Sequence, residues 1–414
     1  MTKLLRAGFS LWIVTLASSF DSILLVRHCA RSMYPTLRRR GDPNFDNANN
    51  YTAQPFPSES LWSAEGEGTC TSRGKDIART FGKSLRAQGL LEGNPEAPVI
   101  VVADNISRCI VSAEEIVKGL NVASPSNVAT YNGITRSLDP SGWAGLCAPE
   151  DAKDRTMTMQ AMIREVASGG HYLSDAWSTR RQVQAELQDL VGAGAAPSIS
   201  TISDHINENG IYVGGLFVSS QGMIENFILE AGAGIPVAWG RLDNQTGRQY
   251  LWERLSPLNV LYNRINHNGE APATRDGAVI VGILRELNNS TPGSLVLVGH
   301  DTNVDNVAAL LDLTWSCGPF ADNESPPQVG LLFEMHGNNV RIKVVCTALD
   351  HSDPAFPVPG EVIVGEVRKG KAVFTGAPVS RLLGEVRPKL SRWGGSDCAG
   401  PVFGQTERLS SVVV

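Results

Sequence analysis

The chain has 414 residues, enough for a large hydrophobic core and for two or three domain-sized units. Hydrophobic residues make up 42% of it and charged residues 19%, which is ordinary for a globular enzyme and excludes a largely disordered chain. The formal net charge of −6 argues against a nucleic-acid-binding protein, which normally has a basic face, but it permits a local positive pocket.

The first 20 residues have the pattern of a secretory signal peptide. Lys3 and Arg6 come before a mostly apolar stretch, Ala7–Ala17, which small residues follow. This stretch is too short for a transmembrane helix. The alternative is a retained N-terminal helix, because cleavage would leave very few residues before the first strand. We predict that residues 1–20 are a signal peptide and that the mature protein is periplasmic or secreted, with no membrane anchor.

The chain contains seven cysteines. Export would permit disulfides, but the spacing does not determine how the cysteines pair. Because seven is odd, at least one thiol is free or pairs with another chain. The sequence has no CxxC motif and no Cys/His zinc pattern, so we expect no metal site.

A short apolar run near the N-terminus, Ile23–Val26, predicts a buried strand. Arg27, His28 and Arg31 follow it at once. Buried charges are costly without a partner, and arginine forks fit phosphate geometry, so this group of cations indicates an anion-binding site. The alternative is a strand that ends in a basic surface loop.

A second apolar run, Leu295–Val298, ends in a similar way at His300 and Asp301. Taken alone, His300 is a core histidine and Asp301 is the N-cap of the helix that follows. Two strands that both end in polar clusters with histidine nevertheless fit the rule that open α/β sheets bind ligands beyond the carboxyl ends of their strands.

A third strand, Pro98–Ala103, is followed by Asp104 and then by Arg108, near the start of a helix that runs to Leu120. We predict an α/β fold with an open, mostly parallel sheet flanked by helices. The predicted domains are an α/β catalytic domain of residues 21–135 and 267–414 and an inserted, mainly helical cap domain of residues 136–266.

Further elements have clear patterns. Thr71–Leu91 has helical periodicity with Thr71 or Ser72 as N-cap, and two strands are expected within Gly330–Leu349. The tail from about Asp350 is rich in proline and glycine and poorly patterned.

Two motifs connect these strand ends to a known family. RHCAR, residues 27–31, resembles the RHGxR signature of the histidine phosphatase superfamily, and GHDTN, residues 299–303, resembles the HD signature of its acid phosphatase branch. That branch holds bacterial periplasmic acid phosphatases, glucose-1-phosphatases and phytases. Three further blocks, residues 103–120, 219–242 and 322–334, resemble family segments and come in the family's order.

The resemblance implies a phosphohistidine mechanism. His28 would be the nucleophile and Asp301 the general acid. The phosphoryl oxygens would be bound by Arg27, Arg31, Arg108 and His300. Since arginines neutralise the phosphate charge, we expect no metal and no cofactor. A phosphate beside Asp301 would raise the pKa of its carboxyl group, which predicts an acidic optimum.

Three further residues are weaker substrate-binding candidates by the same resemblance. Asp104 matches an acid that touches substrate or orients an arginine in relatives, and its alternative role is the N-cap of the helix containing Arg108. Thr36 matches a phosphate contact, but two residues are inserted before Pro35. Glu225 matches a glutamate of the cap helix near the leaving group, and its alternative is an exposed helix acid.

Two positions depart from the family pattern. Cys29 stands where the family has glycine, and its side chain is expected to crowd the phosphate loop or to require another backbone angle. Leu258 stands where some relatives carry a histidine, which weakens the case for a highly charged substrate such as phytate.

The predicted function is an acid phosphatase acting on small-molecule phosphomonoesters, with no nucleic-acid partner. The alternatives are phytase or glucose-1-phosphatase specificity, a phosphotransferase, or an inactive homologue that binds phosphate esters. The sequence makes no prediction of the oligomeric state.

Overall fold

The structure is a computed structural model that describes residues 20–33, 52–91, 99–121, 129–130, 174–192, 205–206, 213–214, 216–266, 277–288, 293–351 and 358–392. Nearly all of the predicted signal peptide lies outside these ranges. Among the described residues, no helix combines the length and the apolar character needed to span a bilayer.

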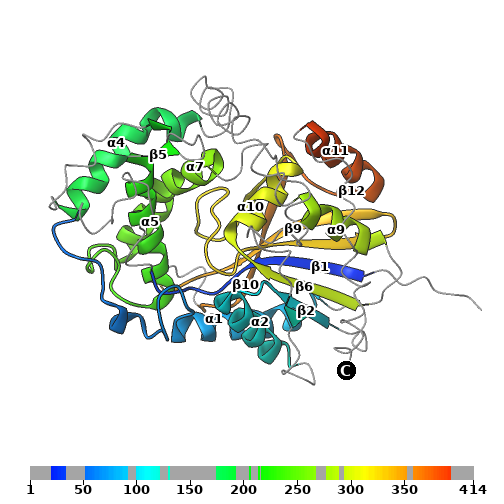
Figure 1. The fold of residues 1–414 in the computed structure, drawn as a ribbon, viewed down its shortest axis with the longest axis horizontal. Coiled ribbons are helices and arrows are strands. Elements are labelled where there is room, and N and C mark those ends of the chain that lie inside the picture. The colour runs from blue at the N-terminus through cyan, green and yellow to red at the C-terminus, as the bar shows by residue number, and fades with distance from the viewer. Residues whose placement is uncertain are drawn as a thin grey trace, which may run out of the picture.

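A mixed sheet of ten strands occupies the centre of the described chain (Figure 1). Its main path runs in the order β11-β10-β9-β8-β1-β6-β2-β3, with β12 paired to β9 and β7 to β10. The strands are β1 (Phe20–Arg27), β2 (Val99–Ala103), β3 (Ala129–Thr130), β6 (Gly293–Gly299), β7 (Leu313–Ser316), β8 (Gly330–His336), β9 (Asn339–Thr347), β10 (Val362–Lys369), β11 (Ala372–Val373) and β12 (Ala377–Pro378). A separate pair joins β4 (His205–Ile206) and β5 (Val213–Gly214).

The sheet has a parallel and an antiparallel half, where the sequence predicted a mostly parallel sheet. Strands β1, β6, β2 and β3 pair in parallel, whereas β8 pairs antiparallel with β1 and β9, and β9 antiparallel with β10. The reason is local chain geometry: short turns at Gly337 and Gly370, both with positive φ, join β8 to β9 and β10 to β11. A tight hairpin connection can join only antiparallel strands.

Strand β1 is buried on both of its faces. Leu24 and Val26 belong to one hydrophobic cluster, whereas Ile23 and Leu25 belong to another. The first cluster includes side chains of α1 and α2, and the second includes side chains of α9, α10 and α11, so helices cover both faces of the sheet (Figure 1). A strand with helices on both sides reads as a continuous apolar run, which explains the sequence pattern.

The helices have the following bounds: α1 (Ser72–Ala87), α2 (Ser107–Leu120), α4 (Ser174–Val191), α5 (Leu216–Ala233), α6 (Gln245–Tyr250), α7 (Ser256–Asn266), α9 (Gly277–Asn288), α10 (Asp301–Leu310) and α11 (Val379–Arg392). A 3-10 turn spans Glu59–Trp62, and a π-helical turn, Leu251–Leu255, joins α6 to α7. Helix α1 begins as predicted after the N-cap Thr71, whose hydroxyl accepts the Gly74 N–H at 2.9 Å.

The helices α4, α5 and α7 lie together beside the sheet (Figure 1). They fall inside residues 136–266, the predicted helical cap, whose boundaries and separateness as a domain stay a prediction. The predicted α/β class with flanking helices is confirmed.

Residues 358–392 form regular elements that the sequence analysis left unassigned. They supply β10, which pairs with β9 and β7, and the helix α11, which packs on the core through Leu382, Val386 and Leu390. The sequence obscured both elements. Helix α11 contains Pro388, a residue normally read as a helix breaker, and β10 is only partly buried.

Candidate active site

Three strand ends meet at one edge of the sheet. In the β1–β6 register Arg27 lies opposite Gly299, and in the β2–β6 register Ala103 lies opposite Val298. Because these strands are parallel, the residues that follow them emerge side by side. The sheet therefore brings His28, Asp104 and His300 into one space, as the sequence predicted.

His28 is almost completely buried, and its hydrogen bonds define its tautomer. Its Nδ1 lies 2.8 Å from the Cys29 carbonyl oxygen, which can only accept, so Nδ1 carries the proton. Its Nε2 then holds a lone pair, which accepts from Arg108 Nε at 2.9 Å. Burial, followed by the charge of Arg108, holds the pKa of His28 well below its ordinary 6.5. His28 is therefore a neutral imidazole with Nε2 directed toward a guanidinium group.

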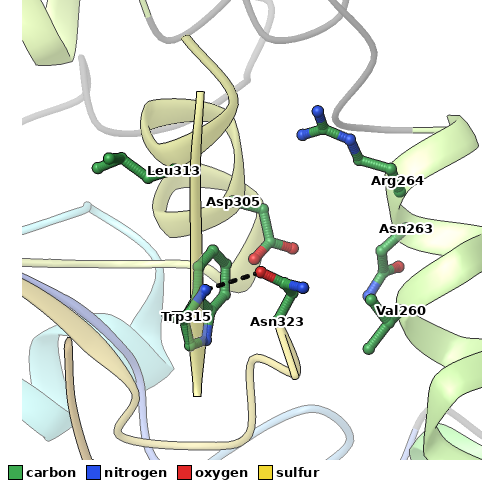
Figure 2. Close-up of a pocket in the computed structure, with 7 residues that line it drawn as sticks. All are labelled: Val260, Asn263, Arg264, Asp305, Leu313, Trp315 and Asn323. Atoms are coloured by element: carbon green, nitrogen blue, oxygen red, sulfur yellow. Dashed lines mark hydrogen bonds between the residues drawn. The ribbon is translucent and has the colours of Figure 1, made fainter. Parts of the chain in front are cut away.

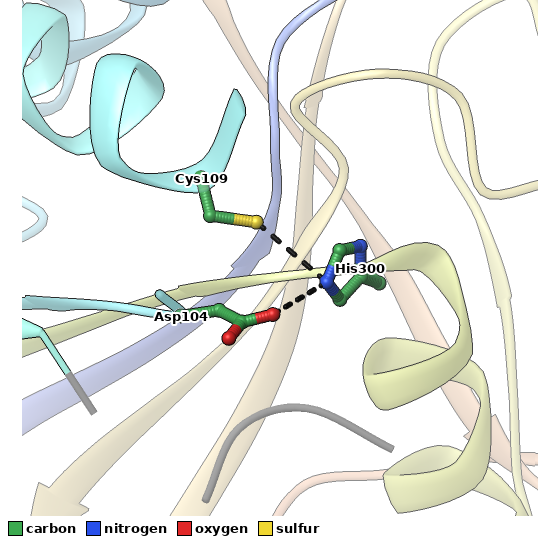
Figure 3. A group of neighbouring side chains, drawn as sticks. All are labelled: Asp104, Cys109 and His300. Atoms are coloured by element: carbon green, nitrogen blue, oxygen red, sulfur yellow. Dashed lines mark hydrogen bonds and ion pairs between the residues drawn. The ribbon is translucent and has the colours of Figure 1, made fainter. Parts of the chain in front are cut away.

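His300 is held by a buried carboxylate (Figure 3). Its Nε2 donates to Asp104 Oδ2 at 2.6 Å, and its Nδ1 lies 3.2 Å from Arg108 Nη2. The rings of His28 and His300 have their centroids 5.3 Å apart at an interplanar angle of 78°. Arg108 thus contacts both histidines, and Nδ1 is the His300 nitrogen that faces the site.

Asp104 is fully buried and is not the N-cap of α2, which is Ile106. Within the described part of the chain, its Oδ1 has no hydrogen-bond partner. Figure 3 shows both Asp104 and the thiol of Cys109 directed at His300, and the Cys109 Sγ lies 3.7 Å from Nε2. The role of Asp104 in this structure is to fix the His300 ring, a contact that the sequence did not indicate.

Asp104, Cys109 and His300 also have ligand atoms within 4.8 Å of one another, the spacing of a metal site. In this structure these side chains form hydrogen bonds with one another instead. The His300 Nε2 proton is directed at Asp104, and burial raises the pKa of the Cys109 thiol, which disfavours the thiolate that a metal requires.

Arg27 is almost fully buried and lies among carboxylates. Its Nη2 is 2.6 Å from Glu225 Oε1 and 3.3 Å from Asp301 Oδ2, and its Nη1 donates to the Ser325 carbonyl. Burial disfavours the charged form, but the coulombic attraction of Glu225 and Asp301 outweighs it and raises the pKa of Arg27. A buried guanidinium between two acids is fixed in position and in charge.

Glu225, on α5, is buried rather than exposed, because it pairs with Arg27 and lies 3.8 Å from Arg31 Nη2. Asp301 is the first residue of α10, whose N-cap is His300, and its side chain is 27% exposed. The carboxyl group of Asp301 is therefore partly accessible to solvent. It also lies at a helix N-terminus, a position that favours negative charge. Thr36 lies outside the described residues.

Sequence reasoning missed Glu324, a fully buried carboxyl group beyond Arg27. It accepts from Ser256 Oγ, from Asn259 Nδ2 at 3.0 Å and from the Ser325 N–H at 3.1 Å. Burial raises its pKa from 4.5 to about 8. The block of residues 322–334 contained it, but nothing in the local pattern separates a buried glutamate from a surface one.

Two disulfides join described cysteines: Cys29–Cys70 and Cys317–Cys346. Cys109 is a free, buried thiol. The crowding expected of Cys29 is therefore resolved by the cross-link, which directs the side chain into the interior. The backbone angle is also ordinary, since Cys29 is not among the described residues with positive φ.

A small cavity lies between α7, α10 and β7, lined by Val260, Asn263, Arg264, Asp305, Leu313, Trp315 and Asn323 (Figure 2). The Trp315 N–H donates to Asn323 Oδ1 at 2.9 Å on its wall. Its volume of about 10 Å³ holds one water molecule at most, so it is not a substrate site.

Comparisons with known proteins agree with this fold. No protein-family model matches the chain. The chain is 25% identical over 372 residues to the phytase AppA of Escherichia coli K12, covering 77% of this chain and 83% of that protein. Two solved structures with a similar fold are the phytases of Klebsiella sp. ASR1 (TM-score 0.70, 17% identity, 93% of this chain, 99% of that chain) and Hafnia alvei (0.69, 18%, 93% and 98%). A third, the phytase of Citrobacter braakii, has TM-score 0.67 and 19% identity over 90% of this chain and 99% of that one.

Proposed function

We propose that this chain, which has the motifs and the fold of the histidine acid phosphatases, hydrolyses phosphomonoesters through a phosphohistidine on His28. The observation that carries the proposal is the neutral His28, whose Nε2 accepts from Arg108 Nε at 2.9 Å. A lone pair beside guanidinium groups is the arrangement that an in-line attack on a phosphoryl group requires.

In the first step, the His28 Nε2 lone pair forms a bond to phosphorus while the bond from phosphorus to the ester oxygen breaks. Arg27, Arg31 and Arg108 bind the non-bridging oxygens and neutralise their charge, and His300 lies beside them with Nδ1 toward the phosphoryl group. The negative charge of the bound phosphate drives the carboxyl group of Asp301 toward its protonated form, and Asp301 then gives its proton to the leaving alcohol.

In the second step, water attacks the phosphohistidine on the side that the alcohol left. Asp301 takes the proton from this water, and the bond between Nε2 and phosphorus breaks to release phosphate. The proton stays on Nδ1, hydrogen-bonded to the Cys29 carbonyl oxygen, throughout, so His28 regains its starting tautomer without a proton shuttle.

Phytate is a second candidate substrate. The observation that favours it is the comparison itself, because the relative and the three structures named above are phytases. Leu258, which stands where some relatives have histidine, argues for a broader phosphomonoesterase.

We also propose that the protein is exported to the periplasm or secreted. The N-terminal pattern of residues 1–20 supports this, as does the disulfide Cys29–Cys70, since disulfides persist in oxidising compartments.

The decisive experiment is hydrolysis of p-nitrophenyl phosphate and of phytate between about pH 3 and pH 8, with EDTA present, by wild type and His28→Ala. Wild type should show an acidic optimum, and His28→Ala should lose at least about 1,000-fold in kcat, as expected for removal of a covalent nucleophile. Because the pKa of His28 lies well below 6.5, protonation of this residue should not limit the rate of wild type near neutral pH.

A folded wild type without activity would support the alternative of an inactive phosphate-ester-binding protein. Activity that persists in His28→Ala would contradict the phosphohistidine mechanism. Transfer of the phosphoryl group to added alcohol, measured as a deficit of free phosphate relative to p-nitrophenol, would identify a phosphotransferase.

A further inference from the structure

Cys29 follows the nucleophile directly and occupies the position of the family's glycine. Its side chain is fully buried and joined to Cys70, which is 2% exposed and lies 41 residues further along the chain. The residue beside the reacting histidine is therefore anchored covalently to another segment.

The backbone of Cys29 connects the nucleophile to the helix that supplies Arg108. Its carbonyl oxygen accepts the His28 Nδ1 proton at 2.8 Å, and its N–H donates to Ser112 Oγ at 2.7 Å. Ser112 Oγ in turn donates to the Arg108 carbonyl at 2.6 Å. A shift of Cys29 would therefore move the His28 ring and loosen its link to the start of α2.

The other half of the disulfide is anchored just as firmly. Cys70 forms a β-bridge with Arg31, and its Sγ lies 3.4 Å from the Arg108 carbonyl oxygen. On either side of it, the Ser32 N–H donates to Thr69 O at 2.9 Å and the Thr71 N–H to Ala30 O at 3.0 Å. Since Thr71 caps α1, the segment with His28 and Arg31 is fastened to the start of that helix.

We propose that Cys29 and Cys70 are a positioning pair for the phosphoryl-transfer reaction. Their disulfide holds the His28 ring, Arg31 and Arg108 in fixed positions relative to one another. This inference rests on the proposed function. Neither sulfur takes part in the reaction and the disulfide is not reduced during turnover. Its effect is preorganisation: with the cross-link, the loop needs no further ordering when the substrate binds.

The test compares three double variants with wild type: Cys29→Ala/Cys70→Ala, Cys29→Gly/Cys70→Ala, which restores the family's glycine, and the control Cys317→Ala/Cys346→Ala. The control removes a different disulfide, Cys317–Cys346, which joins β9 to the residue that follows β7. The measurements are kcat and KM for p-nitrophenyl phosphate, single-turnover formation of phosphoenzyme, binding of inorganic phosphate, and the imidazole ¹⁵N shifts of His28.

Both variants without Cys29–Cys70 should lose about tenfold or more in kcat and in phosphoenzyme formation, because small displacements of reacting groups are costly. Their His28 ¹⁵N shifts should report a mixture of tautomers, and phosphate binding should weaken. The control should keep kcat within about threefold of wild type even where its Tm falls.

The inference is overturned if either variant folds with wild-type kcat and a single His28 tautomer, or if the control loses as much activity. It is also overturned if both variants fail to fold, since the disulfide would then be a folding element. Failure of the proposed function is distinguishable, because it would appear as an inactive wild type, while the ¹⁵N shifts and phosphate binding would still decide the positioning role.

Discussion

The ends of β1 and β6 each present a histidine to the same space, and the two rings lie 5.3 Å apart. His28, after β1, donates a hydrogen bond from Nδ1–H to a neutral backbone carbonyl and directs Nε2 at the site. His300, after β6, donates a hydrogen bond from Nε2–H to the buried carboxylate of Asp104 and directs Nδ1 at the site. The two histidines are thus held through different ring nitrogens, His28 through Nδ1 and His300 through Nε2.

The neighbourhoods of these strand ends differ as well. The β1 end is buried and surrounded by cations, which keeps His28 neutral. The β6 end opens onto solvent at Asp301, whose side chain is 27% exposed. The difference teaches that burial and the choice of hydrogen-bond acceptor can give neighbouring polar groups of one site different environments, as the proposed roles of nucleophile and acid require. Each prediction below disturbs one side of this comparison.

The largest of these effects is expected at the partly exposed Asp301. Asp301→Asn should lower kcat about 100-fold for an alkyl phosphate such as glycerol 2-phosphate, because the alkoxide cannot leave without a proton. The loss should be smaller for p-nitrophenyl phosphate, whose leaving group is a stable anion. Steady-state kinetics with both substrates test this, and equal losses would argue that Asp301 only holds Arg27.

A smaller effect is expected at the partner of His300. Asp104→Asn should raise KM and the inhibition constant of inorganic phosphate about tenfold, since a neutral amide no longer fixes the His300 ring as a charged carboxylate does. As a matched control, Asp76→Asn changes an exposed acid that pairs with Arg79 on α1 and should leave both constants unchanged. Unaltered phosphate inhibition in Asp104→Asn would contradict the positioning role.

The smallest effect concerns stability rather than rate. Burial raises the pKa of Glu324 to about 8 from 4.5, so between these values the folded state holds a proton that the unfolded state has lost. This group therefore lowers the free energy of unfolding as pH rises through that window. In Glu324→Gln the fall in Tm between about pH 5 and pH 8 should be less by a few degrees.

Glu230 on α5 gives a control for this prediction. Burial raises its pKa to about 8 as well, and its Oε2 accepts the Ala238 N–H at 2.9 Å, away from Arg27. Glu230→Gln should flatten the stability profile in the same direction and leave kcat unchanged. A Tm profile identical in wild type and Glu324→Gln would show that Glu324 is ionised in the folded protein.

The amino-acid sequence by itself determined the three strands that end at the site and the order of the residues after them. Apolar runs such as Ile23–Val26 and the periodicity of Thr71–Leu91 report burial directly, because strands and helices bury side chains at fixed intervals. The sequence thus indicated that His28, Arg108 and His300 each follow a strand of the sheet, and the family resemblance was needed to group them in one site.

Only the tertiary structure decided how those side chains are paired. Asp104 bonds to His300 across 196 residues and Glu225 to Arg27 across 198, while Cys29 joins Cys70. Such partners are chosen by how strands, helices and loops pack, and a carboxyl group or a thiol has the same local sequence pattern whether it is buried or exposed. For that reason the polar residues at the strand ends were visible in the sequence, but the contacts that orient them were not.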